Sequence, residues 1–316
     1  MQANLHFIIP QSSEVDNLRH TRHLHNRAHW CTIKNMKLQF IVSAENDGKT
    51  IKQIFAEKGY STELVKKFKY DGDIAVNGKH CTVRQVLNVG DELTLIANEN
   101  ALRPAPAEVP AEVVYADEYL YVADKPYGVN THPDLAHREG TLANGLSAYF
   151  GENFALRIVT RLDRTTSGLV LGALDPVTAE KLNAIQSRHE IAKQYVAVAC
   201  GTPPEPHGVI DLPLLRDDEH NKTIVAEGGK PSVTEYRIIA TMPKRNLAVV
   251  ALTPHTGRTH QLRAHLAAVD CPILGDVLYG GTPAERIYLH CRSLEFAHPV
   301  TGKQVSVTSE IPWNLQ

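Results

Sequence analysis

The residues Arg161-Leu162-Asp163-Arg164-Thr165-Thr166-Ser167-Gly168 place one carboxylate between two arginines, directly before the apolar run Leu169 to Leu174. The length and composition of that run predict a strand, so Asp163 is expected on a loop that a sheet holds in place. The flanking arginines favour the ionised carboxylate, which can act as a nucleophile. The alternative is an ordinary turn aspartate that satisfies only local backbone donors, and this segment alone does not decide between them.

The composition is that of an ordinary globular protein. The chain has 316 residues, 43% of them hydrophobic and 22% charged, with a formal net charge of −2, which leaves room for two domains and excludes disordered and collagen-like classes. Apolar stretches are far shorter than the roughly 18 residues of a membrane span, and no signal peptide pattern opens the chain. We therefore expect a soluble, cytoplasmic protein. Five scattered cysteines without a CxxC pair argue against a disulfide framework or a thiolate zinc site.

Two segments have compositions that disfavour packed structure. Residues 1–36 show little hydrophobic periodicity and carry five of the 16 histidines, so we expect a disordered extension, or sequence upstream of a true start at Met36. Residues 101–112 contain prolines at 104, 106 and 110, which favour an extended linker. These segments divide the chain into a first domain at 37–100 and a second at 113–316.

The first domain is predicted to be a small α/β unit. Thr50 and Ser61 are in position to cap two short helices. Asn77-Gly78 lies between alternating runs, a pattern that indicates a tight hairpin, and Val89 to Leu95 supplies a further strand.

The second domain alternates strand-like and helical runs. The strand-like runs are Val113 to Tyr115, Tyr119 to Ala123, Leu169 to Leu174, Tyr195 to Ala199, Ser232 to Ile239, Leu247 to Leu252 and Val305 to Val307. The helical runs are Thr141 to Tyr149, Val177 to Ser187 and His260 to Ala268. We predict an α+β fold with a mixed, largely antiparallel sheet.

Four ordered blocks in this domain resemble the RluA-type RNA pseudouridine synthase family. They are DKPYGV (124–129), RLDRTTSG (161–168), KQYVAV (193–198) and TGRTHQLRAHLA (256–267) with PILGDVLYG (272–280). The first domain, with VNGK (76–79) and VGDELTL (89–95) after two helices, resembles the S4 RNA-binding fold. One departure is Thr160, where the family usually has histidine.

The resemblance implies that the protein isomerises specific uridines in RNA to pseudouridine, with ribosomal RNA favoured over transfer RNA. The base is detached from its sugar, rotated and rejoined through carbon, which requires no redox or nucleotide cofactor and no metal. A monomer is expected.

The resemblance also assigns three catalytic residues. Asp163 matches the catalytic aspartate, whose carboxylate can trap the sugar carbon as an ester or stabilise positive charge. Tyr195 matches the tyrosine that stacks on the extruded uracil, and its hydroxyl is a candidate to help remove the proton from carbon. Arg263 matches the arginine that pairs with the catalytic carboxylate, and Leu262 would pack nearby.

Further basic residues are candidates for RNA contact. Arg161 matches the arginine associated with backbone contact and flipping of the target nucleotide. Arg164 and Lys125 are weaker candidates for phosphate contacts. In the first domain, Lys66 and Lys67 could meet phosphates, although a solvated helix face has the same pattern.

Two other functions are compatible with the same motifs. A noncatalytic RNA-binding or ribosome-assembly factor would bind RNA and leave no modified base. A hydrolase with an aspartate nucleophile would release free uracil. The histidines between His255 and His298 lack the spacing of a metal site, and Gly275-Asp276 is interpreted as a tight turn and not as a phosphate loop.

Overall fold

The computed structural model describes residues 35–60, 62–98, 103–110, 112–134, 137–151 and 154–314. The expectations for residues 1–34 and for the cap at Ser61 lie outside this range. No helix in the described ranges combines the length and apolar character that crossing a membrane requires.

Residues 35–98 contain a four-stranded antiparallel sheet in the order β1-β4-β2-β3. Its elements are β1 (Asn35–Ile41), η1 (Ala44–Asn46), α1 (Ile51–Glu57), α2 (Thr62–Tyr70), β2 (Gly72–Val76), β3 (Lys79–His80) and β4 (Glu92–Asn98). Thr50 caps α1 through a capping box with Gln53, as predicted. The hairpin at Asn77-Gly78 is also confirmed, because both residues have the positive φ that a tight two-residue turn needs.

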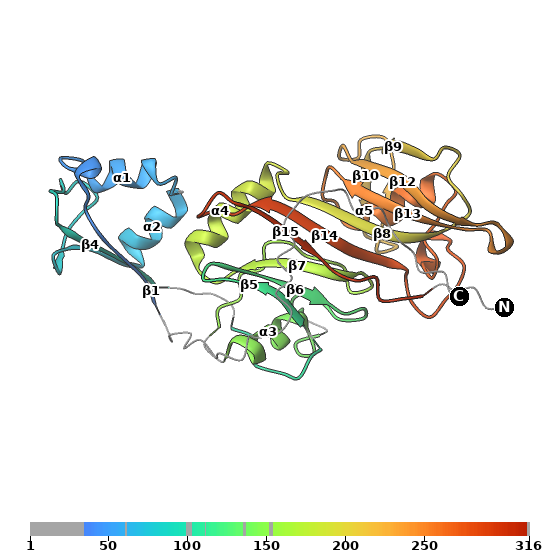
Figure 1. Cartoon of the computed structure of the whole chain (residues 1–316), viewed down its shortest axis with the longest axis horizontal. Helices are drawn as coiled ribbons and strands as arrows, with labels where there is room; N and C mark the ends of the chain where they lie inside the picture. The colour runs from blue at the N-terminus through green and yellow to red at the C-terminus, as the bar shows by residue number, and fades with distance from the viewer. Residues whose placement is uncertain are drawn as a thin grey trace. The chain divides into compact units, whose positions relative to one another are not determined.

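The remainder is built on a nine-stranded sheet, in the order β5-β6-β7-β14-β8-β13-β12-β9, with β15 paired to β14. Figure 1 shows β14 running between β7 and β8. The strands are β5 (Glu112–Ala116), β6 (Leu120–Lys125), β7 (Ser167–Ala173), β8 (Ala192–Cys200), β9 (His207–Asp211), β12 (Val233–Met242), β13 (Leu247–Pro254), β14 (Leu289–Ala297) and β15 (Gln304–Thr308). β7 and β14 are parallel and the other named pairs are antiparallel. The predicted α+β class with a mixed, largely antiparallel sheet is confirmed.

Short elements and three helices accompany this sheet. They are α3 (Leu142–Phe150), α4 (Pro176–Ser187), β10 (Leu214–Asp217), β11 (Lys222–Val225), η2 (Pro243–Arg245), α5 (Gln261–Ala268) and η3 (Val277–Tyr279). One apolar core joins α3 and α4 to β6, β7 and β14, and a second joins α5 to β8 and β13. β10 and β11 form a separate two-stranded ribbon.

The join between β7 and β14 depends on glycine. Gly168 has φ 112°, and a Cβ there would overlap the backbone of Cys291. In the sheet register Cys291 lies opposite both Gly168 on β7 and Tyr195 on β8. The close approach that Gly168 permits therefore brings the Asp163 loop, which precedes β7, next to Tyr195.

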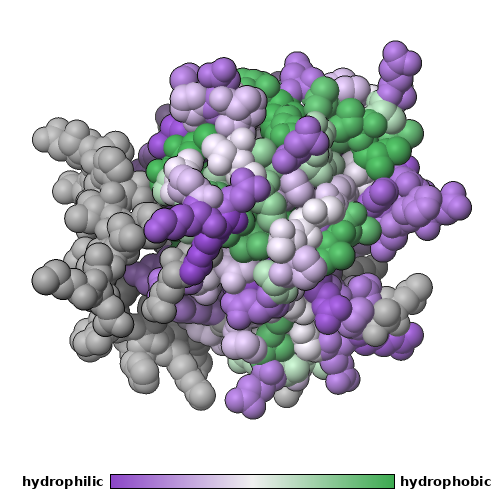
Figure 2. Space-filling view, turned by 90° about the vertical axis from the view of Figure 1, so that its right-hand side faces the viewer, coloured by the Kyte–Doolittle hydropathy of each residue, from purple (hydrophilic) through white to green (hydrophobic). Residues whose placement is uncertain are grey.

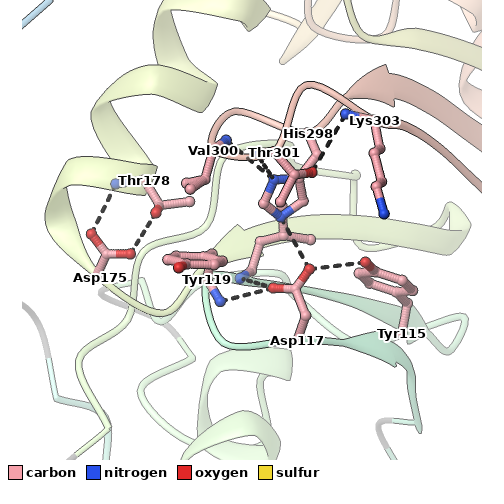
Figure 3. Close-up of polar contacts among 10 residues, drawn as sticks. Tyr115, Asp117, Tyr119, Asp175, Thr178, His298, Val300, Thr301 and Lys303 are labelled. Carbon is pink, nitrogen blue, oxygen red and sulfur yellow. Dashed lines mark hydrogen bonds and ion pairs between the residues drawn. The ribbon is translucent and has the colours of Figure 1, made fainter. Parts of the chain in front are cut away.

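A histidine ties two distant turns of the sheet together (Figure 3). The Nε2 of His298, after β14, lies 3.0 Å from the carboxylate of Asp117, after β5. Its Nδ1 accepts the backbone N–H groups of Val300 and Thr301, and the Tyr115 hydroxyl donates to Asp117 at 2.9 Å. All polar atoms of the ring therefore have partners, which explains this buried histidine without a metal.

The surface at the end of the molecule that carries β9, β12 and β13 mixes apolar and hydrophilic side chains (Figure 2). Exposed apolar residues of β9, the β10–β11 ribbon and η3 are Val209, Leu215, Val225, Val277 and Leu278. Single apolar side chains among polar ones are common on globular proteins.

Candidate active site

The loop that carries Asp163 is fixed by hydrogen bonds on both sides of the aspartate. The Thr131 hydroxyl donates to the carbonyl of Leu162 at 2.7 Å, and the amide of Gly128 donates to the carbonyl of Arg164 at 2.9 Å. The amide of Thr166 closes a turn onto the carbonyl of Asp163 at 3.0 Å. These hydrogen bonds hold the backbone of the loop, and the side chain of Asp163 is 31% exposed.

Asp163 opens into a cleft of about 280 Å³. The cleft is lined by the loop before β7, the end of α4, the start of β8 and the segment from β13 into α5. Among the described residues of the lining, Asp163 is the one acidic residue, whereas the arginines and the lysine are Arg161, Arg258, Arg263 and Lys193. A cleft with this excess of positive charge attracts a polyanion, although the whole chain has a formal net charge of −2.

Tyr195 lines the same cleft from β8, as the resemblance implied. Burial raises the pKa of its hydroxyl well above the usual value, with the Cys291 thiol and Asp163 as further causes. The hydroxyl therefore keeps its proton at neutral pH. A protonated phenol suits stacking and hydrogen bonding to a base better than removal of a proton.

Arg263 also lines the cleft, but its ion pair differs from the expected one. Its Nε and Nη2 donate to the two carboxylate oxygens of Asp276 at 2.6 and 2.8 Å, while its interaction with Asp163 is electrostatic only. The expected direct pairing of Arg263 with Asp163 is therefore corrected. The reason is that the Gly275-Asp276 turn delivers a fully buried carboxylate, and a buried bidentate pair has excellent geometry.

The position of Lys125 also differs from the phosphate-contacting one that was expected. Its side chain is 0% exposed, and its ammonium donates to the carbonyls of Pro126 and Val129 at 2.9 and 2.8 Å. Burial lowers its pKa to about 7. This burial leaves no exposed ammonium for the expected phosphate contact, and Lys125 instead holds backbone carbonyls beside the Asp163 loop.

The other candidate binding residues lie as follows. Arg161 is exposed and lines the cleft, and Leu262 lines it from α5 as a buried residue. Arg164 is not part of the lining and donates its Nε to the carbonyl of Gly128 at 2.9 Å. Lys66 and Lys67 are exposed on α2, whose Leu64 and Phe68 are buried.

At Thr160, where the sequence departs from the family pattern, the side chain has a structural partner. Thr160 is buried, and its hydroxyl accepts the amide of Leu171 on β7 at 2.9 Å. The residue therefore supports β7, the strand that follows the Asp163 loop.

Sequence reasoning missed three residues around Arg263. His260 was treated only as a member of a rejected metal set, yet its Nε2 lies 3.8 Å from Asp163. Asp276 pairs with Arg263, and the ring of Tyr279 lies 4.9 Å from the guanidinium. Both belong to the PILGDVLYG block, so their position in a recurring motif was the available signal.

The described residues hold no group of three or more His, Cys, Asp or Glu side chains that could bind a metal ion. Buried histidines have other partners: the two nitrogens of His265 lie at the Thr234 hydroxyl and the Leu212 carbonyl.

Comparisons with known proteins agree with this geometry. Residues 119–268 match the family model described as RNA pseudouridylate synthase. The chain is 34% identical to the Bacillus subtilis protein named uncharacterized RNA pseudouridine synthase YjbO, over 84% of this chain and 96% of that one. It is 31% identical to ribosomal large subunit pseudouridine synthase D of Escherichia coli K12, over 89% of this chain and 93% of that one.

A solved structure of human RNA pseudouridylate synthase domain containing 1 matches with a TM-score of 0.56 and 27% identity, over 66% of this chain and 86% of that one. The matched family segment contains Asp163, Tyr195 and Arg263, the residues that the fold brings to one cleft. The chain therefore belongs to the RNA pseudouridine synthase family and is an enzyme that isomerises uridine in RNA to pseudouridine.

Proposed function

We propose that Asp163 is the nucleophile of this isomerisation. The observation that carries the proposal is that Asp163 is the one carboxylate among the residues described in the lining of a cationic cleft. The nearby Asp276 is fully buried and committed to Arg263, so it is not available to a substrate.

In the proposed reaction a flipped uridine enters the cleft and stacks on Tyr195. The Asp163 carboxylate attacks C1′ of the ribose and the C1′–N1 bond breaks, which leaves uracil with the electron pair. After rotation of the base, C5 attacks C1′ and displaces the carboxylate, and the loss of the C5 proton to solvent is balanced by protonation of N1. Arg161 and the other cationic side chains of the lining neutralise the RNA phosphates.

The test compares wild-type protein with Asp163→Asn on ribosomal and transfer RNA, with pseudouridine mapped by mass spectrometry. Asp163→Asn is expected to abolish modification while RNA binding is retained. Asp270→Asn is the matched control, because Asp270 is exposed outside the cleft and asparagine tolerates its left-handed φ of 56°. Unchanged modification by Asp163→Asn would remove Asp163 from the mechanism, and free uracil among the products would indicate hydrolysis.

We propose ribosomal RNA as the substrate. The support is the similarity to a protein named as a ribosomal large subunit pseudouridine synthase over 89% of this chain. Pseudouridine maps of ribosomal and transfer RNA from cells with and without this protein test the assignment. Loss of a modification from transfer RNA alone would contradict it.

We also propose that residues 37–100 are an S4-like RNA-binding module joined to the catalytic domain at 113–316 by the linker 101–112. The exposed Lys66 and Lys67 on α2 support phosphate contact, since the apolar face of that helix is buried in the core. A noncatalytic binding protein is disfavoured, because the three expected catalytic residues share one cleft.

We further propose that the enzyme is a monomer and acts in the cytoplasm. Light scattering during size-exclusion chromatography tests the monomer, and cell fractionation tests the compartment.

A further inference from the structure

We propose that His260 is a positioning residue for Asp163, held by Tyr279 in the tautomer whose Nε2–H faces the catalytic carboxylate. The inference rests on the proposed role of Asp163. It concerns one hydrogen bond, which would orient one carboxylate oxygen and leave the other for the sugar carbon.

The first observation is the placement of His260. Its Nε2 lies 3.8 Å from Oδ2 of Asp163, and its side chain is 15% exposed in the wall of the cleft. This separation exceeds a hydrogen bond, which spans about 2.7–3.2 Å, but catalytic hydrogen bonds are often long before substrate binds. The proposed hydrogen bond is therefore one that forms in the substrate complex.

The second observation is the backbone of His260. The residue has φ 54° directly before α5, and its side chain makes no capping hydrogen bond to that helix. A left-handed conformation costs a residue with a Cβ on the order of 1 kcal/mol. The conformation aims the ring at Asp163 and Tyr279 and away from the helix end.

The third observation is the set of contacts that the Tyr279 hydroxyl makes. The amide of Thr223 on β11 donates to the hydroxyl oxygen of Tyr279 at 2.8 Å. That hydroxyl lies 3.1 Å from Nδ1 of His260. In the proposed arrangement the oxygen accepts from Thr223 and donates its own proton to Nδ1, which then carries no hydrogen. The ring proton consequently lies on Nε2, toward Asp163.

The charge state agrees with this assignment. Burial and the neighbouring Arg263 lower the pKa of His260, against the opposing effect of Asp163. The other charged groups that act on the ring are Arg216 and Asp276. The imidazole is therefore neutral at pH 7, and it donates one hydrogen bond without becoming an ion pair.

Two amide variants separate this role from simple packing. The amide nitrogen of His260→Gln can reproduce a donor at the Nε2 position, whereas that of His260→Asn reaches only the Nδ1 position. We expect His260→Gln to keep kcat within about threefold, and His260→Asn to lower kcat about 10- to 100-fold with KM unchanged. Equal kcat values for the two variants, or a change confined to KM, would overturn the proposal.

A spectroscopic test does not depend on activity. The ¹⁵N chemical shifts of histidine-labelled wild-type protein, with the His260 signals identified by their loss in His260→Gln, distinguish the two neutral tautomers. We expect the Nε2–H form in the wild type and a mixture of forms in Tyr279→Phe, which removes the hydroxyl. An Nδ1–H ring in the wild type would refute the inference even if Asp163 is the nucleophile. Conversely, an active Asp163→Asn variant would contradict only the proposed function and the positioning role that rests on it, and the tautomer would stand.

Discussion

Asp163 and Asp276 both interact with Arg263, and their exposure separates their roles. Asp163 is 31% exposed in the cleft, whereas Asp276 is fully buried and takes two hydrogen bonds from the guanidinium. An accessible carboxylate can meet a substrate. A buried carboxylate with a bidentate partner instead fixes the arginine, which places its positive charge beside the reacting group.

Replacement of Asp276 should therefore act mainly through stability. In Asp276→Leu the guanidinium of Arg263 stays buried without its partner, which is expected to cost about 3–5 kcal/mol in free energy of unfolding. Urea denaturation followed by circular dichroism measures the change. A loss below 1 kcal/mol, in a protein that still folds, would mean that Arg263 finds another partner such as Asp163.

Tyr195 provides a prediction about stacking. Because burial keeps its hydroxyl protonated, Tyr195→Phe should retain most activity and the wild-type pH profile. Tyr195→Ala removes the ring, and kcat/KM should fall about 10- to 100-fold, the range of one base stacked on an aromatic side chain. Single-turnover rates across pH measure both variants. A large loss in Tyr195→Phe would restore the hydroxyl as a proton-transfer group.

Among the elements, β14 connects the two strands that position Asp163 and Tyr195. It pairs with β7, β8 and β15, so it holds the strand that follows the Asp163 loop next to the strand that carries Tyr195. Its residues Leu289 to Leu294 were not predicted as a strand. The polar residues His290, Arg292 and Ser293 obscure the alternation expected of a strand, and a position between two other strands is a property of the fold.

The contact of β7 with β14 can be tested at Gly168. Gly168→Ala combines a positive φ of 112° with overlap of the new methyl group and the Cys291 backbone. Since β14 would have to move, we expect a loss of stability of about 2–4 kcal/mol and a larger loss of activity than of RNA binding. Thermal unfolding and pseudouridine assays measure these effects. Gly140→Ala is a control with a positive φ of 69° and no neighbour within 4 Å of the added methyl group.

We predict that His290 on β14 makes the stability of the protein sensitive to acid. The Ser167 hydroxyl accepts from Arg286 at 2.6 Å and lies 3.0 Å from Nδ1 of His290, to which its own proton can donate when the ring is neutral. Burial, with Arg286 and Arg292 nearby, lowers the pKa of His290 to about 4.

The unfolded state therefore binds more protons between pH 6.5 and 4, and stability is full above this window and falls as pH drops through it. The contribution is up to about 3 kcal/mol. Urea denaturation of the wild type and of His290→Gln at several pH values measures it. If both proteins lose stability in parallel through the window, His290 is not the source.

At the scale of the whole molecule, charge placement counts for more than net charge. The chain carries a formal net charge of −2, but the cleft and the exposed side of α2 collect basic side chains. A polyanion meets these local fields at distances shorter than the Debye length of about 8–10 Å.

This arrangement predicts a salt-dependent role for α2. Lys66→Ala with Lys67→Ala should weaken RNA binding and reduce the slope of log affinity against log salt by about 1–2, because each phosphate contact releases counterions. The rate at saturating RNA should not change. Lys244→Ala with Arg245→Ala removes two charges from η2, outside the cleft lining, and serves as the matched control. Equal slopes in both double variants would argue against the proposed S4-like role.

The amino-acid sequence by itself determined the local elements and the reactive groups. Capping at Thr50, the Asn77-Gly78 turn and the strand after Asp163 follow from interactions among neighbouring residues. Tyr195 and Arg263 were found in motifs. Each of these features depends on residue type and short spacing, which a linear pattern records.

Only the tertiary structure decided which groups pair and which are buried. It joined Arg263 to Asp276, buried Lys125 among backbone carbonyls and set His260 beside Asp163. Hydrogen-bond partners and desolvation depend on residues far away in the chain that packing brings within a few ångströms, so a residue's type and near neighbours do not specify them.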